Sequence, residues 1–140
     1  MSHIVDTSVV LKWVVQEAGS DAARSWVGTS LAAPDFIRAE LANALWKKVR
    51  IGEIEPHQAS RGLRDGLEPV SLVPTMPLVE RALPLAISLP HPVYDCIFLT
   101  LAESLDMPLL TSDKKLWART RRTSFGDRVV LLTSREVENG

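Results

Sequence analysis

Short apolar runs alternate with helical patterns along almost the whole chain, and this alternation restricts the fold more than any other feature. The apolar runs predict strands at residues 3–6, 31–33, 70–73, 108–111 and 129–132. Helices are predicted between them at residues 8–16, 21–30, 34–50, 56–67, 77–89, 93–105 and 113–121. Strands that alternate with helices form mostly parallel sheets with both faces covered. We therefore predict an α/β fold around such a sheet.

Prolines, glycines and polar residues set the expected limits of these elements. Pro34 and Asp35 are expected to open the long helix, with Pro34 near its first turn and Asp35 as its cap, and Gly52 stands just beyond its end. Pro84 lacks the N–H that a helix interior requires, so it predicts a kink or a break. The polar tail from Ser134 is expected to fray.

Length and composition restrict the class of protein. The chain has 140 residues, 46% hydrophobic and 24% charged, which predicts one folded domain over residues 1–140. The net charge of −1 excludes a global attraction to nucleic acid or membranes. The single cysteine, Cys96, excludes an internal disulfide, suits a reducing compartment and is expected in the core. The chain carries no signal-peptide pattern and no membrane-spanning apolar stretch, so we expect a cytoplasmic protein.

Two carboxylates stand directly after predicted strands near opposite ends of the chain. Asp6 follows the first strand and Asp113 the fourth, and each has two neighbouring hydroxyls, from Thr7 and Ser8 and from Thr111 and Ser112. Ligands bind at the carboxyl ends of strands in open parallel sheets. Neither turn contains the glycines of a phosphate loop, so both point to a cation site. Helix N-capping is the alternative for both aspartates, and the neighbouring hydroxyls weaken it at Asp6 because they can cap the same helix.

Asp95 lies among apolar neighbours on a predicted helix. Phe98, Leu99 and Ala102 stand three, four and seven positions further on and share its face. A carboxylate on such a face is destabilising unless it is paired or binds a metal. Asp95 is therefore a candidate metal ligand. The alternative is an anion stabilised by the helix dipole near the helix start.

Glu40 is less conspicuous, because it lies one turn into the long helix on a partly polar face. That face continues with Asn43 and Lys47, so a solvated glutamate is the default interpretation. Asn43, one turn further on, is placed to orient Glu40 or to contact a ligand.

The pattern of metal-binding residue types favours a hard cation. His3, His57 and His91 are scattered without the spacing of helical metal ligands, and we interpret them as surface or strand-end residues. Carboxylates without a cluster of histidines or cysteines fit Mg²⁺ or Mn²⁺. A site for a soft metal is not expected.

Four segments, spread over nearly the whole chain, contain these acids: IVDTSVVLKW, APDFIRAELANALWK, HPVYDCIFLTLAE and PLLTSDKKLW. Together they resemble the PIN-domain ribonucleases, specifically the VapC-type toxins of prokaryotic toxin–antitoxin pairs. The resemblance implies a three-layer α/β/α fold and a metal-dependent endoribonuclease that hydrolyses RNA phosphodiester bonds. It implies metal ligation by Asp6, Glu40, Asp95 and Asp113. It also implies that hydroxyls orient carboxylates or water, from Thr7 or Ser8 and from Thr111 or Ser112.

The resemblance implies two protein partners, a second copy of the chain in a homodimer and a small VapB-type antitoxin. The chain is rich in tryptophan, and these residues are expected to pack in the core, with a protein interface as the alternative: Trp13, Trp26, Trp46 and Trp117.

RNA binding also requires cations near the acids. The candidates are Lys12, Lys47, Lys48 and Arg50, and then Lys114, Lys115, Arg119, Arg121 and Arg122. The second group is preferred because it begins beside a predicted metal ligand. For each single residue, an ordinary solvated helix face is the alternative.

Two other functions compete with a nuclease. A metal-dependent phosphatase with an aspartate nucleophile requires a second aspartate two positions after the first, where this chain has Ser8. A PIN-like module that binds RNA or protein without catalysis would keep the fold, but acids at all four positions argue against it. Stabilisation by Mn²⁺ that is lost in Asp95→Asn would favour the nuclease.

Overall fold

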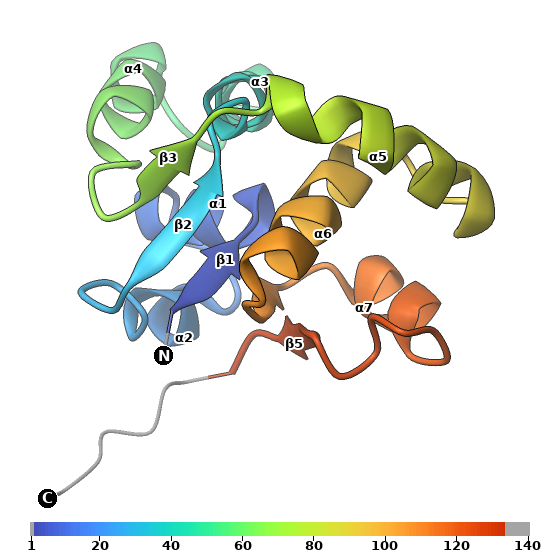
Figure 1. Ribbon diagram of the computed structural model, residues 1–140. Helices are drawn as coiled ribbons and strands as arrows, with labels where there is room; N and C mark the ends of the chain where they lie inside the picture. Colours follow the sequence, from blue (N-terminus) through green and yellow to red (C-terminus); the bar gives the residue numbers. More distant parts are fainter. Residues whose placement is uncertain (1, 134–140) are drawn as a thin grey trace, which may run out of the picture.

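Five short strands form one parallel sheet in the order β3-β2-β1-β4-β5, and Figure 1 shows β3, β2 and β1 side by side. The computed structural model describes residues 2–133, so the tail predicted to fray from Ser134 lies outside the described residues. The strands are β1 (His3–Val5), β2 (Leu31–Pro34), β3 (Ser71–Val73), β4 (Leu109–Thr111) and β5 (Val129–Leu131). In β1, Ile4 pairs with Ala32 on one side and Leu109 on the other. The predicted α/β fold with a parallel sheet is confirmed.

Helices connect the strands and cover both faces of the sheet. They are α1 (Thr7–Val14), α2 (Ser20–Arg24), α3 (Ile37–Arg50), α4 (Pro56–Asp65), α5 (Met76–Ser88), α6 (Val93–Leu105) and α7 (Lys114–Thr120). One face contacts α6, which lies across β1, β2 and β4 and carries α5 on its outer side. The other face contacts α1, which packs against α2 and α3 (Figure 1). These are the three layers that the resemblance implied.

The core lies between the sheet and its helices. Ile4 in β1, Leu109 and Leu110 in β4 and Leu99 in α6 are fully buried. Burying one such side chain stabilises the fold by roughly 1.5–3 kcal/mol. Cys96 is also fully buried, as expected for a cysteine that acts as a small apolar residue.

The junction between β2 and α3 differs from the prediction. Pro34 is the last residue of β2, opposite Val73, and not part of the first helical turn. Proline has no N–H to donate. The hydrogen bond to β3 at this point comes from the next residue, because the Asp35 N–H donates to the Val73 carbonyl at 2.8 Å, so the pairing of β2 with β3 does not need a donor at Pro34. Asp35 does not cap α3 either. Its carboxylate accepts from the Thr75 backbone N–H at 3.2 Å and from the Thr75 hydroxyl at 2.6 Å, which joins the ends of β2 and β3.

Two helices differ in extent from their predictions. The helix predicted at residues 21–30 ends at Arg24, and turns follow in which Gly28 has a φ of 95°. That left-handed conformation suits glycine and does not continue a helix. In contrast, α5 runs on through Pro84, so the predicted break is absent. Pro84 and Glu80 are both exposed, so water can solvate the Glu80 carbonyl that has lost its N–H partner.

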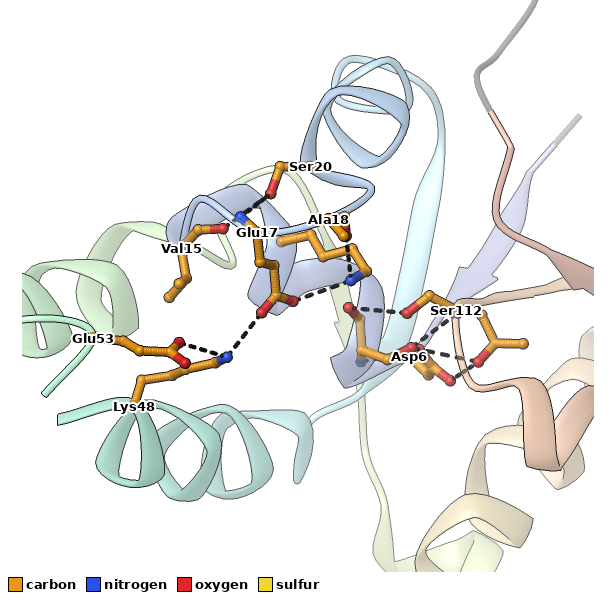
Figure 2. A network of polar contacts seen from close by, with 11 residues as sticks. Asp6, Val15, Glu17, Ala18, Ser20, Lys48, Glu53 and Ser112 are labelled. Carbon is orange, nitrogen blue, oxygen red and sulfur yellow. Dashed lines mark hydrogen bonds and ion pairs between the residues drawn. The ribbon is translucent and has the colours of Figure 1, made fainter. Parts of the chain in front are cut away.

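Glu17 joins α1 to α3 through two lysines (Figure 2). Its carboxylate oxygens lie 3.1 Å from the Lys12 Nζ and 2.9 Å from the Lys48 Nζ. Lys48 also pairs with Glu53 at 2.8 Å, and Lys12 donates to the Ala18 carbonyl at 2.7 Å. Both lysine side chains are less than one fifth exposed. The cluster fixes the relative position of the two helices that begin beside the predicted acids.

No single helix within residues 2–133 is long and apolar enough to span a membrane. Only together do α5 and α6 reach the length and apolar composition of a membrane span, and the two helices are bent by 114° relative to each other.

We expect Thr75→Val to lower the free energy of unfolding by about 1–3 kcal/mol. The substitution keeps the side-chain shape but removes the hydroxyl that donates to Asp35 and accepts from the Phe36 backbone N–H at 3.0 Å. Urea unfolding measures the loss, and Thr75→Ser, which keeps the hydroxyl, is the control. Equal stability of Thr75→Val and the parent chain would contradict the role of this contact.

Candidate active site

The predicted acids meet at the carboxyl edge of the sheet, at the point where the strand order reverses. After β1 the chain builds β2 and β3 on one side, and it returns through α5 and α6 to place β4 on the other side of β1. Asp6 directly follows β1, and Asp113 lies two residues after β4. This reversal point is the usual ligand-binding crevice of open α/β sheets.

Asp6 is buried at the centre of this edge, with only 6% of its surface exposed. Its Oδ1 accepts from the Ser8 N–H at 3.1 Å and from the Ser8 hydroxyl at 2.5 Å, and its Oδ2 accepts from the Thr111 hydroxyl. Burial raises the pKa of Asp6 from 3.8 to about 7, and Asp95 and Asp113 add to the rise, whereas the two hydroxyl bonds oppose it. Asp6 also caps α1, so the capping alternative describes part of its role.

The predicted hydroxyls connect the two acidic turns. Ser112 donates its backbone N–H to the Ser8 hydroxyl at 3.0 Å, and Figure 2 shows Ser112 beside Asp6. The Asp113 N–H donates to the Thr111 hydroxyl at 3.0 Å. Residues more than a hundred positions apart therefore form one hydrogen-bonded seam, and the seam holds the Asp6 carboxylate in a single orientation.

Glu40 reaches the same site from α3. The Thr7 hydroxyl donates to its Oε1 at 2.8 Å. Burial raises the pKa of Glu40, the Thr7 bond opposes the rise, and the charge of Asp95 adds to it. The default interpretation of Glu40 as a solvated side chain is therefore wrong. Asn43 is exposed, and within residues 2–133 no hydrogen bond joins it to Glu40, which is instead oriented by Thr7; the alternative role of Asn43, contact with a ligand, stays a prediction.

Asp95 and Asp113 complete the group. Asp113 caps α7 by accepting the N–H groups of Lys115 and Leu116, and both bonds use its Oδ1. Helix capping, the alternative interpretation of Asp113, thus uses one of its two carboxylate oxygens, and the carboxylate also lies at the acidic edge of the sheet. Burial raises the pKa of Asp95, a hydrogen bond from His91 lowers it, and the charge of Asp113 raises it further. The charge of Asp95 raises the pKa values of both Asp6 and Glu40, and the charge of Asp113 raises those of Asp6 and Asp95, so Asp95 links the four acids into one electrostatic group.

His91 is a site residue that the sequence interpretation missed. Its Nε2 lies 2.6 Å from the Asp95 Oδ2, and only 7% of its side chain is exposed. Ligand atoms of His91, Asp95 and Asp113 all lie within 4.8 Å of one another. The interpretation of His91 as a surface or strand-end residue is therefore wrong. The available signal was its position four residues before Asp95, a spacing that brings two side chains together across a helix start.

Within residues 2–133, four of the predicted RNA-binding cations have other polar partners. Lys12 and Lys48 are held by Glu17, Arg119 donates to the Pro90 carbonyl in the loop before α6, and Arg121 donates to the carbonyls of Gly126 and Val129. Lys47, Lys114 and Lys115 are exposed, as an RNA contact requires. Lys12 is therefore a structural cation, and Arg119 anchors the loop that carries His91.

The tryptophans do not all pack in the core. Trp13, Trp26 and Trp117 are partly buried against it. Trp46 is 54% exposed, and the Arg50 guanidinium lies 5.5 Å from the centre of its ring. The prediction of a core role is wrong for Trp46, because it points away from the sheet on α3.

The donor atoms at this edge fit a divalent cation. Carboxylate oxygens are the ligands that hard cations such as Mg²⁺ and Mn²⁺ prefer, and the His91 imidazole, which is hydrogen-bonded to Asp95, would orient that carboxylate. Buried carboxylates with raised pKa values also gain from a cation, which neutralises their mutual repulsion.

Comparisons with known proteins agree with this geometry. Residues 3–122 match the PIN domain family. Ribonuclease VapC3 of Pyrobaculum aerophilum is 31% identical over 83% of this chain and 92% of its own length. Exonuclease VapC9 of the same organism is 35% identical over 59% of this chain, a match that spans 61% of that relative's length.

Solved structures show the same fold. A crystal structure of a Pyrobaculum aerophilum protein superposes with a TM-score of 0.70 at 27% identity, over 85% of this chain and 79% of that one. A toxin–antitoxin complex from Klebsiella pneumoniae contains a chain with a TM-score of 0.66 at 17% identity, over 95% of this chain and 99% of its own. The fold and the acidic edge define a nuclease-type α/β domain. The chain belongs to the PIN domain family and, within it, to the VapC-like proteins, as its four acidic segments predicted.

In the absence of metal, we expect the stability of the chain to fall as pH rises toward 7. The unfolded chain releases the Asp6 proton near pH 3.8, whereas the folded chain keeps it up to about pH 7. Between these values the contribution of this group to the free energy of unfolding falls by up to about 1.4 kcal/mol per pH unit. Asp6→Asn removes the titration. Urea unfolding in EDTA should therefore show that the free energy of unfolding of Asp6→Asn increases relative to that of the parent chain as pH rises.

The exposed Asp21, on α2, offers a matched control. Asp21→Asn should follow the pH dependence of the parent chain. If Asp6→Asn also followed it, the buried proton at Asp6 would be disproved.

We expect His91→Ala to weaken Mn²⁺ binding by about 10- to 100-fold, as is typical when a group that supports a metal ligand is removed. His91→Gln, which can still donate a hydrogen bond to Asp95, should recover much of the affinity. Calorimetric titration with Mn²⁺ measures both variants, and His57→Ala on α4 is the control. Unchanged affinity in His91→Ala would exclude His91 from the site.

Proposed function

We propose that this chain is a metal-dependent endoribonuclease, and that it is the toxin of a toxin–antitoxin pair. The proposal depends on one observation, the convergence of Asp6, Glu40, Asp95 and Asp113 at the strand-reversal point of a PIN domain. The relatives described above, a VapC ribonuclease and a VapC exonuclease, support it. The proposal covers residues 1–140 as one nuclease domain.

The four carboxylates would hold Mg²⁺, or Mn²⁺ in its place. A bound divalent ion polarises the phosphodiester, activates water and neutralises charge in the transition state. Asp6 is fixed for this task by Ser8 and Thr111, and Glu40 by Thr7. Because Asp6 retains a proton up to about pH 7, an ion held by this carboxylate would compete with that proton, so affinity for the ion should rise with pH.

The RNA backbone would be held by lysines close to the acids. Lys114 and Lys115 open α7 directly after Asp113, and Lys47 lies on the exposed face of α3. Such contacts to phosphate oxygens position the substrate without reading its sequence. Lys12 and Arg119 support the fold of this region instead.

An antitoxin would occupy the cleft between α1, α2 and α4, which has a volume of about 730 Å³. Trp13, Val14 and Val27 give this cleft an apolar lining, and Arg24 and Arg61 add positive charge. An amphipathic segment with acidic residues fits such a surface. A homodimer would use the exposed stripe on α5 formed by Met76, Val79, Leu83 and Ile87, which recur at helical spacing.

We expect the purified chain to cleave a circular single-stranded RNA in Mg²⁺ or Mn²⁺, because only an endonuclease can cut a substrate without ends. EDTA should stop the reaction. Asp6→Asn and Asp95→Asn should slow it by at least about 100-fold, since losing a ligand exceeds the 10- to 100-fold cost of losing its support. Gel electrophoresis of the products measures the rate.

Asp21→Asn, on the exposed face of α2, should cleave at the parental rate. Full activity in both site variants, with folding verified by circular dichroism, would overturn the proposed function. Linear RNA cleaved only from its ends would replace it with an exonuclease.

A further inference from the structure

Tyr94 is an exposed aromatic residue next to the proposed metal site. It lies in the first turn of α6, directly before Asp95, and 60% of its surface is exposed. Most large apolar residues of α6 are buried, which makes the exposed ring at this position unusual within the helix. Neither metal binding nor the hydrogen-bonded seam uses it.

The ring is held in place by a stack of aromatic residues. Tyr94 stacks on Phe36, with ring centres 6.0 Å apart and planes inclined by 26°. Phe36 in turn packs against Phe98 at 5.5 Å, and Phe98 is buried in the core. One face of the tyrosine ring is thus supported through Phe36 by the core, and the exposure of the residue leaves the other face open to solvent.

The stack lies beside the acids on both of its helices. Phe36 caps α3 and precedes Glu40 by one turn on the same face. Tyr94 is the sequence neighbour of Asp95 on α6. The backbone at Phe36 is itself fixed, because its N–H donates to the Thr75 hydroxyl at 3.0 Å. Two helices that supply proposed metal ligands therefore also supply the two rings.

We propose that Tyr94 is a stacking platform for an unpaired nucleobase of the RNA substrate, next to the phosphate that is cut. The inference rests on the proposed nuclease function. An unpaired base offers a flat apolar face, and aromatic side chains are the usual partners of such faces in single-stranded RNA. A ring supported by Phe36 loses little side-chain freedom when a base stacks on it, which favours binding. The lysines near the acids would hold the backbone, while Tyr94 would hold the base.

The test uses RNA binding in the cleavage-deficient Asp6→Asn chain with Mg²⁺, measured by fluorescence anisotropy. The probes are a short labelled oligoadenosine and an abasic oligonucleotide of the same length and charge. Tyr94→Ala should weaken oligoadenosine binding by about 10-fold, within the range of one lost base stack. It should leave abasic binding unchanged. Tyr94→Phe, which keeps the ring, should bind like the parent, and so should Trp46→Ala, which removes an exposed aromatic residue from the middle of α3.

The outcomes separate this inference from the proposed function. If the parent chain cleaves circular RNA but Tyr94→Ala binds oligoadenosine as tightly as before, the platform is wrong and the nuclease stands. Equal weakening for both probes would make Tyr94 a general support of the fold and would also overturn the platform. A change of molecular mass in Tyr94→Ala, measured by light scattering, would instead assign the ring to contact with a second copy of the chain. A parent chain that neither binds nor cleaves RNA would overturn both.

Discussion

The burial of several carboxylates together at one sheet edge is the constraint on which the rest of the structure depends. Burial and like charges raise the pKa values of Asp6, Glu40 and Asp95. The fold offsets part of this cost with hydroxyls and an imidazole, each donating to one acid. The remaining cost is what a divalent cation would relieve, so the same strain that lowers stability without metal provides affinity for it.

Structural and functional roles coincide at several of these residues. Asp6 and Asp113 cap the helices that follow them while their carboxylates lie in the site. Such a cap contributes roughly 0.5–2 kcal/mol and also holds the acid at the positive end of a helix dipole. Helix capping and metal binding were competing interpretations in the sequence, but one carboxylate has two oxygens, so the cap does not exclude the metal ligation that we propose. The hydrogen-bonded seam between the two acidic turns likewise joins the ends of β1 and β4 and orients Asp6.

The charged and aromatic side chains around the site fall into two groups, those paired within the fold and those exposed to solvent. Lys12 and Lys48 hold α1 against α3 through Glu17, and Arg119 anchors the loop before α6. The exposed lysines after Asp113 form no ion pair in the described part of the chain, and Tyr94 adds an exposed aromatic surface directly before Asp95. Such unpaired cations would be the ones available to a phosphate backbone.

The sequence by itself determined the alternation of strands and helices, the parallel sheet and the acids at the strand ends, because periodicity and strand-end position are local properties. The resemblance of four segments added Glu40, which its own pattern did not single out. Only the tertiary structure decided which side chains meet across long separations. It paired Thr7 with Glu40, joined Asp35 to Thr75, brought Thr111 to Asp6, and linked Glu17 to Lys48. These contacts depend on how helices pack on the sheet, and no local pattern encodes that packing.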